Sequence, residues 1–159
     1  MLERLKNISL FLVMATILVV FSKSIASLFL FEFIKNNLIT ILIALLAINT
    51  TTGSVVMTKL RDISDKNGVD FSSTIGELRS SIVEQVVFII LGIILLILAG
   101  SPIILELYEY MSEILNILLV SVFIGSLYNL YDTANSIFVI LNHENDENQK
   151  IKGGGVNRE

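Results

Sequence analysis

Four long apolar stretches alternate with short polar segments along this chain. They cover residues 8–30, 38–58, 82–100 and 114–141. A bilayer core about 30 Å thick is crossed by about 20 apolar residues in a helix, and each stretch meets or nearly meets that length. The runs are continuous rather than alternating, which disfavours a β-barrel. The pattern therefore predicts an all-α integral membrane protein with four transmembrane helices.

The polar residues within the first stretch allow two positions for the end of the first span. Lys23 lies late in the stretch, where its ammonium group can reach the outer interface along its own apolar stem. The alternative is a shorter first span that ends near Ser22, with residues 24–33 lying in the outer interface. In both cases Asn36 and Asn37 predict the turn that precedes the second helix.

Other local signals predict the remaining boundaries. Thr74 and Glu77 have the spacing of a capping box, which indicates that the third helix starts before the membrane. The polar segment 142–159 contains three consecutive glycines and is expected to be a disordered cytoplasmic tail. This leaves residues 1–141 as a single four-helix transmembrane domain.

The basic residues predict the orientation of the four helices. When the helices are threaded alternately, nine of the eleven Lys and Arg residues fall on one side of the membrane and two on the other. The nine are Arg4, Lys6, Lys59, Arg61, Lys66, Arg79, Lys150, Lys152 and Arg158. Positive charge is retained in the cytoplasm. We therefore expect both termini and the loop 59–81 to be cytoplasmic.

Composition argues against several classes of function. The chain has no cysteine, which excludes disulfides, thiolate metal sites and cysteine catalysis. No segment gathers Lys and Arg with aromatic residues as nucleic-acid-binding proteins do. The single histidine, His143, lies in the polar tail and not beside a serine in the membrane. A calcium loop over 62–74 fails because Ile63 and Thr74 occupy ligand positions. We expect no enzymatic activity, no cofactor and no metal site.

A polar run inside the second stretch supplies the first candidate residues. Asn49 is followed by three threonines, Gly53 and Ser54. A threonine hydroxyl can bond the carbonyl one turn back, whereas the Asn49 amide needs a partner from another helix, another subunit or water. The run either holds helices together or forms a polar pore lining or hinge.

A polar stripe on the fourth stretch supplies the second group. At 100° per residue, its members lie within an arc of about 120°. Asp132 is the most informative of them, since an acidic group inside a span is costly and marks a functional site by default. It lies at the inner interface if the membrane ends near Ala134, or about 14 Å inside if the membrane ends at Leu141. The stripe comprises Ser121, Gly125, Tyr128, Asn129, Asp132, Asn135 and Ser136.

Together the two groups predict a polar vestibule or pore lining in the cytoplasmic half of the membrane. Glu84 enters the third helix at a similar level and joins them. The candidate residues are Asn49, Thr50, Thr52, Gly53, Glu84, Ser121, Gly125, Asn129, Asp132 and Asn135.

Two segments resemble the membrane component of the Rex phage-exclusion pair, a small four-helix protein of the bacterial inner membrane. The first is Ile41-Leu42-Ile43-Ala44, with Gly53-Ser54, Leu60 and Ile63 after it, and the second is Phe123 followed by Leu127-Tyr128-Asn129-Leu130. Residues 131–141 continue the helix where that family becomes polar. By architecture the chain is also similar to the membrane partner in Kiwa-type antiphage systems. The resemblance implies an ion-permeable membrane effector that a cytosolic partner activates upon infection.

These observations favour an oligomeric inner-membrane effector or sensor of an antiphage system. A channel would need several copies around a shared axis, because one stripe is too narrow for a conduit. A cytosolic companion would dock on the loop 59–81 or on the C-terminal tail. The alternative is a non-conducting immunity or assembly subunit that binds another membrane protein, and a holin-like pore is a third possibility.

Overall fold

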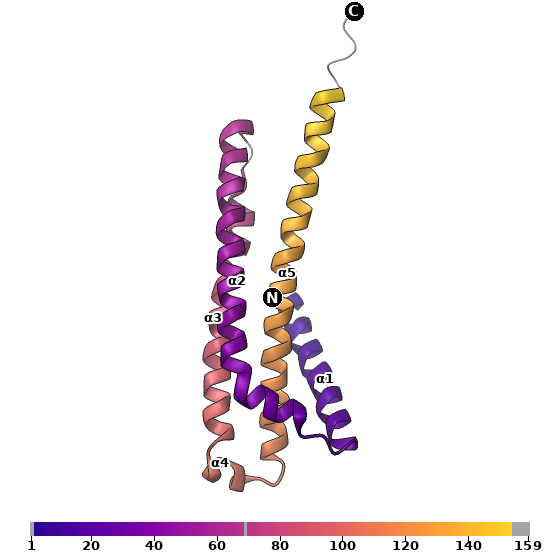
Figure 1. Ribbon diagram of the computed structural model, residues 1–159, viewed down its shortest axis with the longest axis vertical. Coiled ribbons are helices and arrows are strands. Elements are labelled where there is room, and N and C mark those ends of the chain that lie inside the picture. Colours follow the sequence, from indigo (N-terminus) through magenta and orange to yellow (C-terminus); the bar gives the residue numbers. More distant parts are fainter. Residues whose placement is uncertain (1, 69, 154–159) are drawn as a thin grey trace, which may run out of the picture.

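The computed structural model describes the backbone of residues 2–68 and 70–153 and the side chains of residues 6–65, 68 and 70–135. This part of the chain is entirely helical apart from short connections (Figure 1). The helices are α1 (Leu2–Ser24), α2 (Phe29–Asn67), α3 (Ser72–Ala99), α4 (Pro102–Leu107) and α5 (Met111–Gly153). Four of them contain segments long and apolar enough to cross a membrane, namely Lys6–Ser24, Phe29–Asp65, Ser72–Ala99 and Met111–Asn135. The predicted fold class is therefore confirmed.

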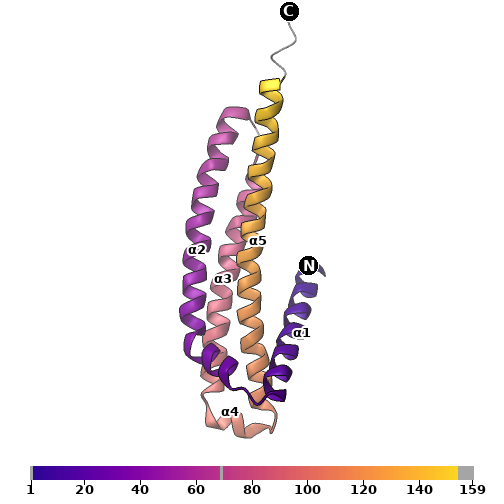
Figure 2. The ribbon, with the colours of Figure 1, turned by 45° about the vertical axis from the view of Figure 1, so that its right-hand side comes forward.

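The bundle has two different ends. At one end lie α4 and the turn 25–28 between α1 and α2, and this end is called the α4 end below. At the other end α2 and α3 are joined, and residues 59–81 are called the hairpin end. α2, α3 and α5 pack against one another, and α1 packs mainly on α5 (Figure 2). Their shared core is apolar and includes Ala15, Leu38, Leu42, Leu115, Leu119 and Val120.

The first helix is shorter than the stretch 8–30. α1 ends at Ser24, and the chain reverses through Ala26, which has a positive φ of 53°. The Ser22 hydroxyl donates to the Ser27 carbonyl at 2.7 Å, and the Ser27 N–H donates to the Ser22 carbonyl at 2.9 Å. These bonds satisfy backbone groups that a helix end leaves open. The end at Ser24 lies close to the shorter alternative.

α2 then runs through the two asparagines at which a turn was expected. The Asn37 amide donates to the Phe33 carbonyl at 2.9 Å, one turn back in the same helix. Extending an existing helix needs no new nucleus, so two residues of weak propensity do not interrupt it. The first turns of α2, which contain the stacked rings of Phe29 and Phe33, cross the α4 end before the helix bends to run along α3 (Figures 1 and 2).

The expected loop 59–81 is mostly a helical hairpin. α2 continues to Asn67, where Gly68 adopts a left-handed conformation (φ 67°) and its N–H bonds the Ser64 carbonyl at 2.8 Å. A left-handed residue after the last helical turn is a usual helix terminator, and glycine adopts it without steric cost. A small apolar cluster of Val56, Leu60 and Leu78 holds the two helices together at this end.

α3 starts at Ser72, so the Thr74–Glu77 pair does not cap it. Phe71 is the N-cap residue and makes no side-chain capping bond, while the Oδ1 of the preceding Asp70 accepts the Ser72 N–H at 2.9 Å. This backbone hydrogen bond stabilises the carboxylate and lowers the pKa of Asp70 below its ordinary value. A side chain that precedes the helix thus satisfies one of the N–H groups that a helix start leaves open.

α5 is longer than the stretch 114–141. It continues without a break to Gly153, so the backbone of residues 142–153 is helical where a disordered tail was expected. The segment contains no proline, and its Glu, Gln and Lys residues propagate a helix readily once a span has nucleated it. Residues 154–159 of the expected tail lie outside the described residues. Figure 1 shows α5 diverging from the α2–α3 hairpin toward the hairpin end.

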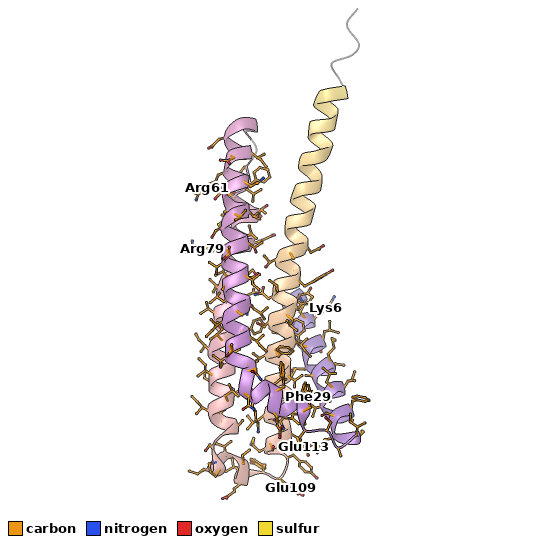
Figure 3. All side chains as sticks on the ribbon, in the orientation of Figure 1. Lys6, Phe29, Arg61, Arg79, Glu109 and Glu113 are labelled. Atoms are coloured by element: carbon orange, nitrogen blue, oxygen red, sulfur yellow. The ribbon has the colours of Figure 1, made fainter. Side chains whose placement is uncertain are left out.

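Charged residues are separated between the two ends. Figure 3 shows Arg61 and Arg79 toward the hairpin end, and Glu109 and Glu113 at the α4 end. At the α4 end the Lys23 ammonium pairs with the Glu113 carboxylate and ties α1 to α5. The ion pair gives Lys23 a partner within the chain, in addition to the reach toward the interface that its position suggested.

We expect the hairpin end to depend on its own small cluster. Val56→Ala removes buried methyl groups and should destabilise this end by about 1–2 kcal/mol. Amide hydrogen exchange of the reconstituted protein should then speed up by about tenfold across the hairpin end and remain unchanged near the α4 end. Val55→Ala is the matched control, because the Val55 side chain is 57% exposed. Equal effects of the two variants on hydrogen exchange would contradict the stabilising role of this apolar cluster.

Candidate functional site

A hydrogen-bonded polar network joins α3 to α5 inside the bundle. The Asn129 amide donates to the Gln85 Oε1 at 3.2 Å and to the Ser81 carbonyl at 2.9 Å. The Gln85 Nε2 donates to the Ser126 hydroxyl at 2.5 Å. The Ser81 hydroxyl donates to the Asn129 Oδ1 at 2.7 Å and lies 2.6 Å from the Thr133 hydroxyl. The network therefore connects five polar side chains without interruption.

Helical spacing explains why these side chains meet. Ser81 and Gln85 are four residues apart on α3, and Ser126, Asn129 and Thr133 are three and four apart on α5. Residues at these spacings share one face of a helix. All but Ser81 are buried, and Gln85 and Ser126 are completely inaccessible. Because an unpaired polar group is costly in an apolar interior, the paired groups hold α3 and α5 in one register.

The network forms one wall of a groove between α3 and α5. The groove is lined almost entirely by polar residues, and Glu77, Glu84 and Asp132 bring three carboxyl groups to it. The Glu84 and Asp132 side chains also interact with other groups of the protein. The groove is lined by Thr74, Glu77, Leu78, Ser80, Ser81, Glu84, Asn129, Asp132 and Thr133. Of the ten candidate residues, Glu84, Asn129 and Asp132 line this groove.

On the other side of the network the core is apolar. Among the described residues of α2, α3 and α5, no buried polar side chain lies between Ser126 and the α4 end. That part of the core contains Leu38, Leu42, Ala99, Leu115 and Leu119. Water and ions avoid such an interior because they lose their hydrogen bonds there. In this conformation, the buried polar side chains of these helices therefore extend from the groove to about halfway along the bundle and no farther.

The structure separates the candidate residues of α2. Asn49 is buried at 1% exposure, and neither atom of its amide has a hydrogen-bond partner. Gly53 is also buried and faces Ile82, since a Cβ at Gly53 would lie 3.7 Å from the Ile82 Cδ1. Thr52 is half-buried, and Thr50 is exposed. The four residues therefore do not share one lining.

The hydroxyl groups near this run are satisfied within α2 itself. Thr51 donates to the Ala47 carbonyl at 2.8 Å, and Ser54 donates to the Thr50 carbonyl at 2.8 Å. These are the bonds to the preceding turn that the sequence suggested. They let exposed hydroxyl groups face lipid without an external partner.

The predicted stripe of α5 is also divided. Ser121 bonds the Ile117 carbonyl at 2.8 Å, and only Asn129 belongs to the network. Asp132 and Asn135 are exposed, and Asp132 lines the groove. The Ser81–Thr133 contact puts Asp132 level with Gly53, about 9 Å along the bundle from Lys59.

Gly125 acts in packing rather than as a polar lining. A Cβ at this position would lie 3.0 Å from the Phe88 ring and 3.2 Å from the Phe11 ring. The missing side chain therefore lets α1 and α3 approach α5 closely, as small residues do between membrane helices. The Phe11 ring also contacts the Tyr128 ring, with centroids 5.3 Å apart. The stripe is thus covered over part of its length by α1 and α3.

Four members of the network were not among the candidate residues, namely Ser81, Gln85, Ser126 and Thr133. The buried face of α5 is rotated by about one residue from the stripe, and it passes through Ser126, Asn129 and Thr133. The available signal was the match between their spacing and that of Ser81 and Gln85 on α3. Within the described part of the chain, no group of three or more His, Asp or Glu side chains could hold a metal ion.

Comparison with known proteins adds no relative to this description. No protein-family model matches the chain, and no curated protein or solved structure matches it significantly.

The network should contribute measurably to stability. Asn129→Leu removes the residue that joins Gln85 to Ser81 and leaves their polar groups short of partners. We expect a loss of about 1–3 kcal/mol in the free energy of unfolding, measured by denaturation in mixed micelles. Asn135→Leu changes an exposed amide on the same helix and serves as the control. A network without energetic importance would give the same small change in both variants.

Close packing at Gly125 gives a second expectation. Gly125→Val places methyl groups against Phe88 and Phe11, and overpacking of this kind costs about 1–3 kcal/mol. The variant should unfold more easily and should loosen α1, which hydrogen exchange across residues 6–24 would detect. Gly76→Ala is the control, because a Cβ there meets no atom within 4 Å and alanine favours the helix. Faster exchange only in α5 would contradict the role in seating α1.

Proposed function

We propose that this multi-pass membrane protein is an oligomeric inner-membrane effector or sensor of a bacterial antiphage system, operated by a cytosolic companion. The observation that carries the proposal is the one-sided polar network. It leads from a groove at the hairpin end to the middle of the bundle and is closed beyond Ser126 by an apolar core. Such an arrangement suits a resting state that a signal from one side of the membrane can change. The resemblance to the Rex exclusion component supports the assignment to an antiphage system.

The charge distribution supports a cytoplasmic position for the hairpin end. Lys59, Arg61 and Arg79 belong to it, whereas Glu109 and Glu113 lie at the α4 end (Figure 3). Membrane proteins keep an excess of basic residues in short cytoplasmic segments. The groove therefore opens toward the cytoplasm in this proposal, and the companion approaches from that side.

The projecting helices supply the surface for the companion. α2 has 39 residues, about twice what a bilayer requires, and its last turns form a hairpin with α3. Exposed charged residues, among them Lys59, Arg61 and Asp62, cover this projection. Because the hairpin is held by its own apolar cluster, force on it is transmitted along two rigid helices toward the network.

Conduction requires a change from this conformation. Asn129 and Gly125 are buried between helices of one chain and do not reach an axis shared by several copies. Asp132 and Asn135 are exposed and can do so. We infer that an effector state either exposes the buried network or uses these exposed groups in an oligomer.

The experiment measures membrane potential in bacteria that express the chain together with the cytosolic protein that copurifies with it. During infection we expect depolarisation that depends on both proteins. Asp132→Ala should change its extent, while Asp62→Ala, an exposed carboxylate at the hairpin end, serves as the control. An unchanged membrane potential throughout infection would contradict the proposal that the chain is an effector. Purification in gentle detergent followed by mass measurement of the intact complex would then test the sensor, which requires a bound companion.

The non-conducting immunity or assembly subunit remains the second candidate, and the internal pairing of the network favours it. Polar groups that satisfy one another serve to fix helix packing. This function predicts a stable complex with another membrane protein and no change of potential in any variant that folds. A holin-like pore predicts lysis upon expression of the chain alone.

A further inference from the structure

Asn49 is the one buried side chain in the described part of the chain whose amide has no partner at either atom. It follows Leu42 and Leu45 and precedes Gly53 on the buried side of α2, at spacings of three and four residues. It therefore points into the same interface as the leucines rather than toward lipid. At 1% exposure it is inaccessible to a second copy of the chain.

The pairing of α2 with α3 puts Asn49 near the level of Gln85. A Cβ at Gly92 would lie 3.1 Å from Leu42, and a Cβ at Gly53 would lie 3.7 Å from Ile82. Counting along the two antiparallel helices puts Asn49 level with Gln85 from the first contact and with Val86 from the second. Two buried amide side chains thus lie within about one helical turn of each other along the α2–α3 interface, although no hydrogen bond joins them.

Gln85 is directed toward α5 instead. It bonds Ser126 and Asn129 on that helix, and its contact with α2 is a hydrogen bond of 3.4 Å to the Leu42 carbonyl. This arrangement provides hydrogen-bond partners for the polar side chains of α5. It leaves both amide atoms of Asn49 unpaired in an apolar interior, which is unfavourable.

We propose that Gln85 exchanges between two partners, the polar residues of α5 and Asn49 of α2. In the second state the two amides pair across the α2–α3 interface. The Ser126 hydroxyl then bonds the Val122 carbonyl, in the way that Ser121 bonds the Ile117 carbonyl at 2.8 Å. Asn129 keeps both of its bonds to Ser81. Every buried group retains a partner in the second state, and the pairing of Asn49 offsets the loss of the bonds from Gln85 to α5.

The exchange changes which helices are joined. In the state described above, Gln85 ties the α2–α3 hairpin to α5. In the second state Gln85 ties α3 to α2, and the hairpin is connected to α5 through Asn129, Ser81 and Thr133. The core of the bundle thus contains a switch between two hydrogen-bond arrangements. The proposal concerns this chain alone and does not rest on the proposed companion or on conduction.

Magic-angle-spinning NMR of the full chain in lipid bilayers tests the exchange, with the Asn and Gln side-chain amides labelled. We expect two sets of Gln85 side-chain signals, one correlated through space with Asn129 and one with Asn49. Asn49→Leu should leave only the first set. Ser126→Ala removes a bond from the first state and should raise the second set by about fivefold relative to the first.

Asn37→Leu is the matched control for Asn49→Leu, because it removes an exposed amide of α2 that bonds only its own helix. Both sets of Gln85 signals should persist in that variant. The correlations in the unsubstituted chain decide the question even if a variant fails to fold. A single Gln85 set without an Asn49 correlation would overturn the proposal, as would an Asn49 amide that correlates only with water.

Discussion

The hydrogen bonds between Gln85 on α3 and Ser126 and Asn129 on α5 are the interactions on which the arrangement of the bundle depends. Apolar side chains pack against lipid almost as favourably as against one another, so leucines alone specify little about how membrane helices pair. Amides and hydroxyls have no such freedom, because each must find a partner in a medium without water. The network therefore determines which faces of α3 and α5 meet, and the apolar residues around it pack accordingly.

The other features of the bundle can be understood from this pairing. With α3 and α5 joined, α2 covers them through Leu38, Leu42 and Leu45, and α1 occupies the close approach that Gly125 allows. The groove arises where α3 and α5 continue toward the hairpin end beyond the network. The apolar half toward the α4 end completes a one-sided arrangement, and this asymmetry is what the proposed function and the proposed amide exchange have in common.

The structure also changes the meaning of a polar stripe on a membrane helix. On α5, residues within one arc of the helical wheel have three different roles. Asn129 binds α3, Gly125 receives aromatic rings, and Asp132 lines a groove. The helical wheel predicted that this face of α5 avoids lipid along much of the helix. It could not show that neighbouring chain segments, rather than a shared pore axis, cover the buried part.

The sequence by itself determined the number of spans, the helical class and the separation of basic from acidic ends, because span length and charge are properties of each segment alone. Asn129 was identified as a member of the polar stripe on the fourth stretch, which is likewise a property of one segment. Only the tertiary structure decided that α1 ends at Ser24, that α2 continues through Asn36 and Asn37, and that Gln85 bonds α5 while Asn49 remains unpaired. These outcomes depend on which helices lie against each other and in what register. A hydrogen bond between Gln85 and Ser126, 41 residues apart, is a property of that register and of no single segment.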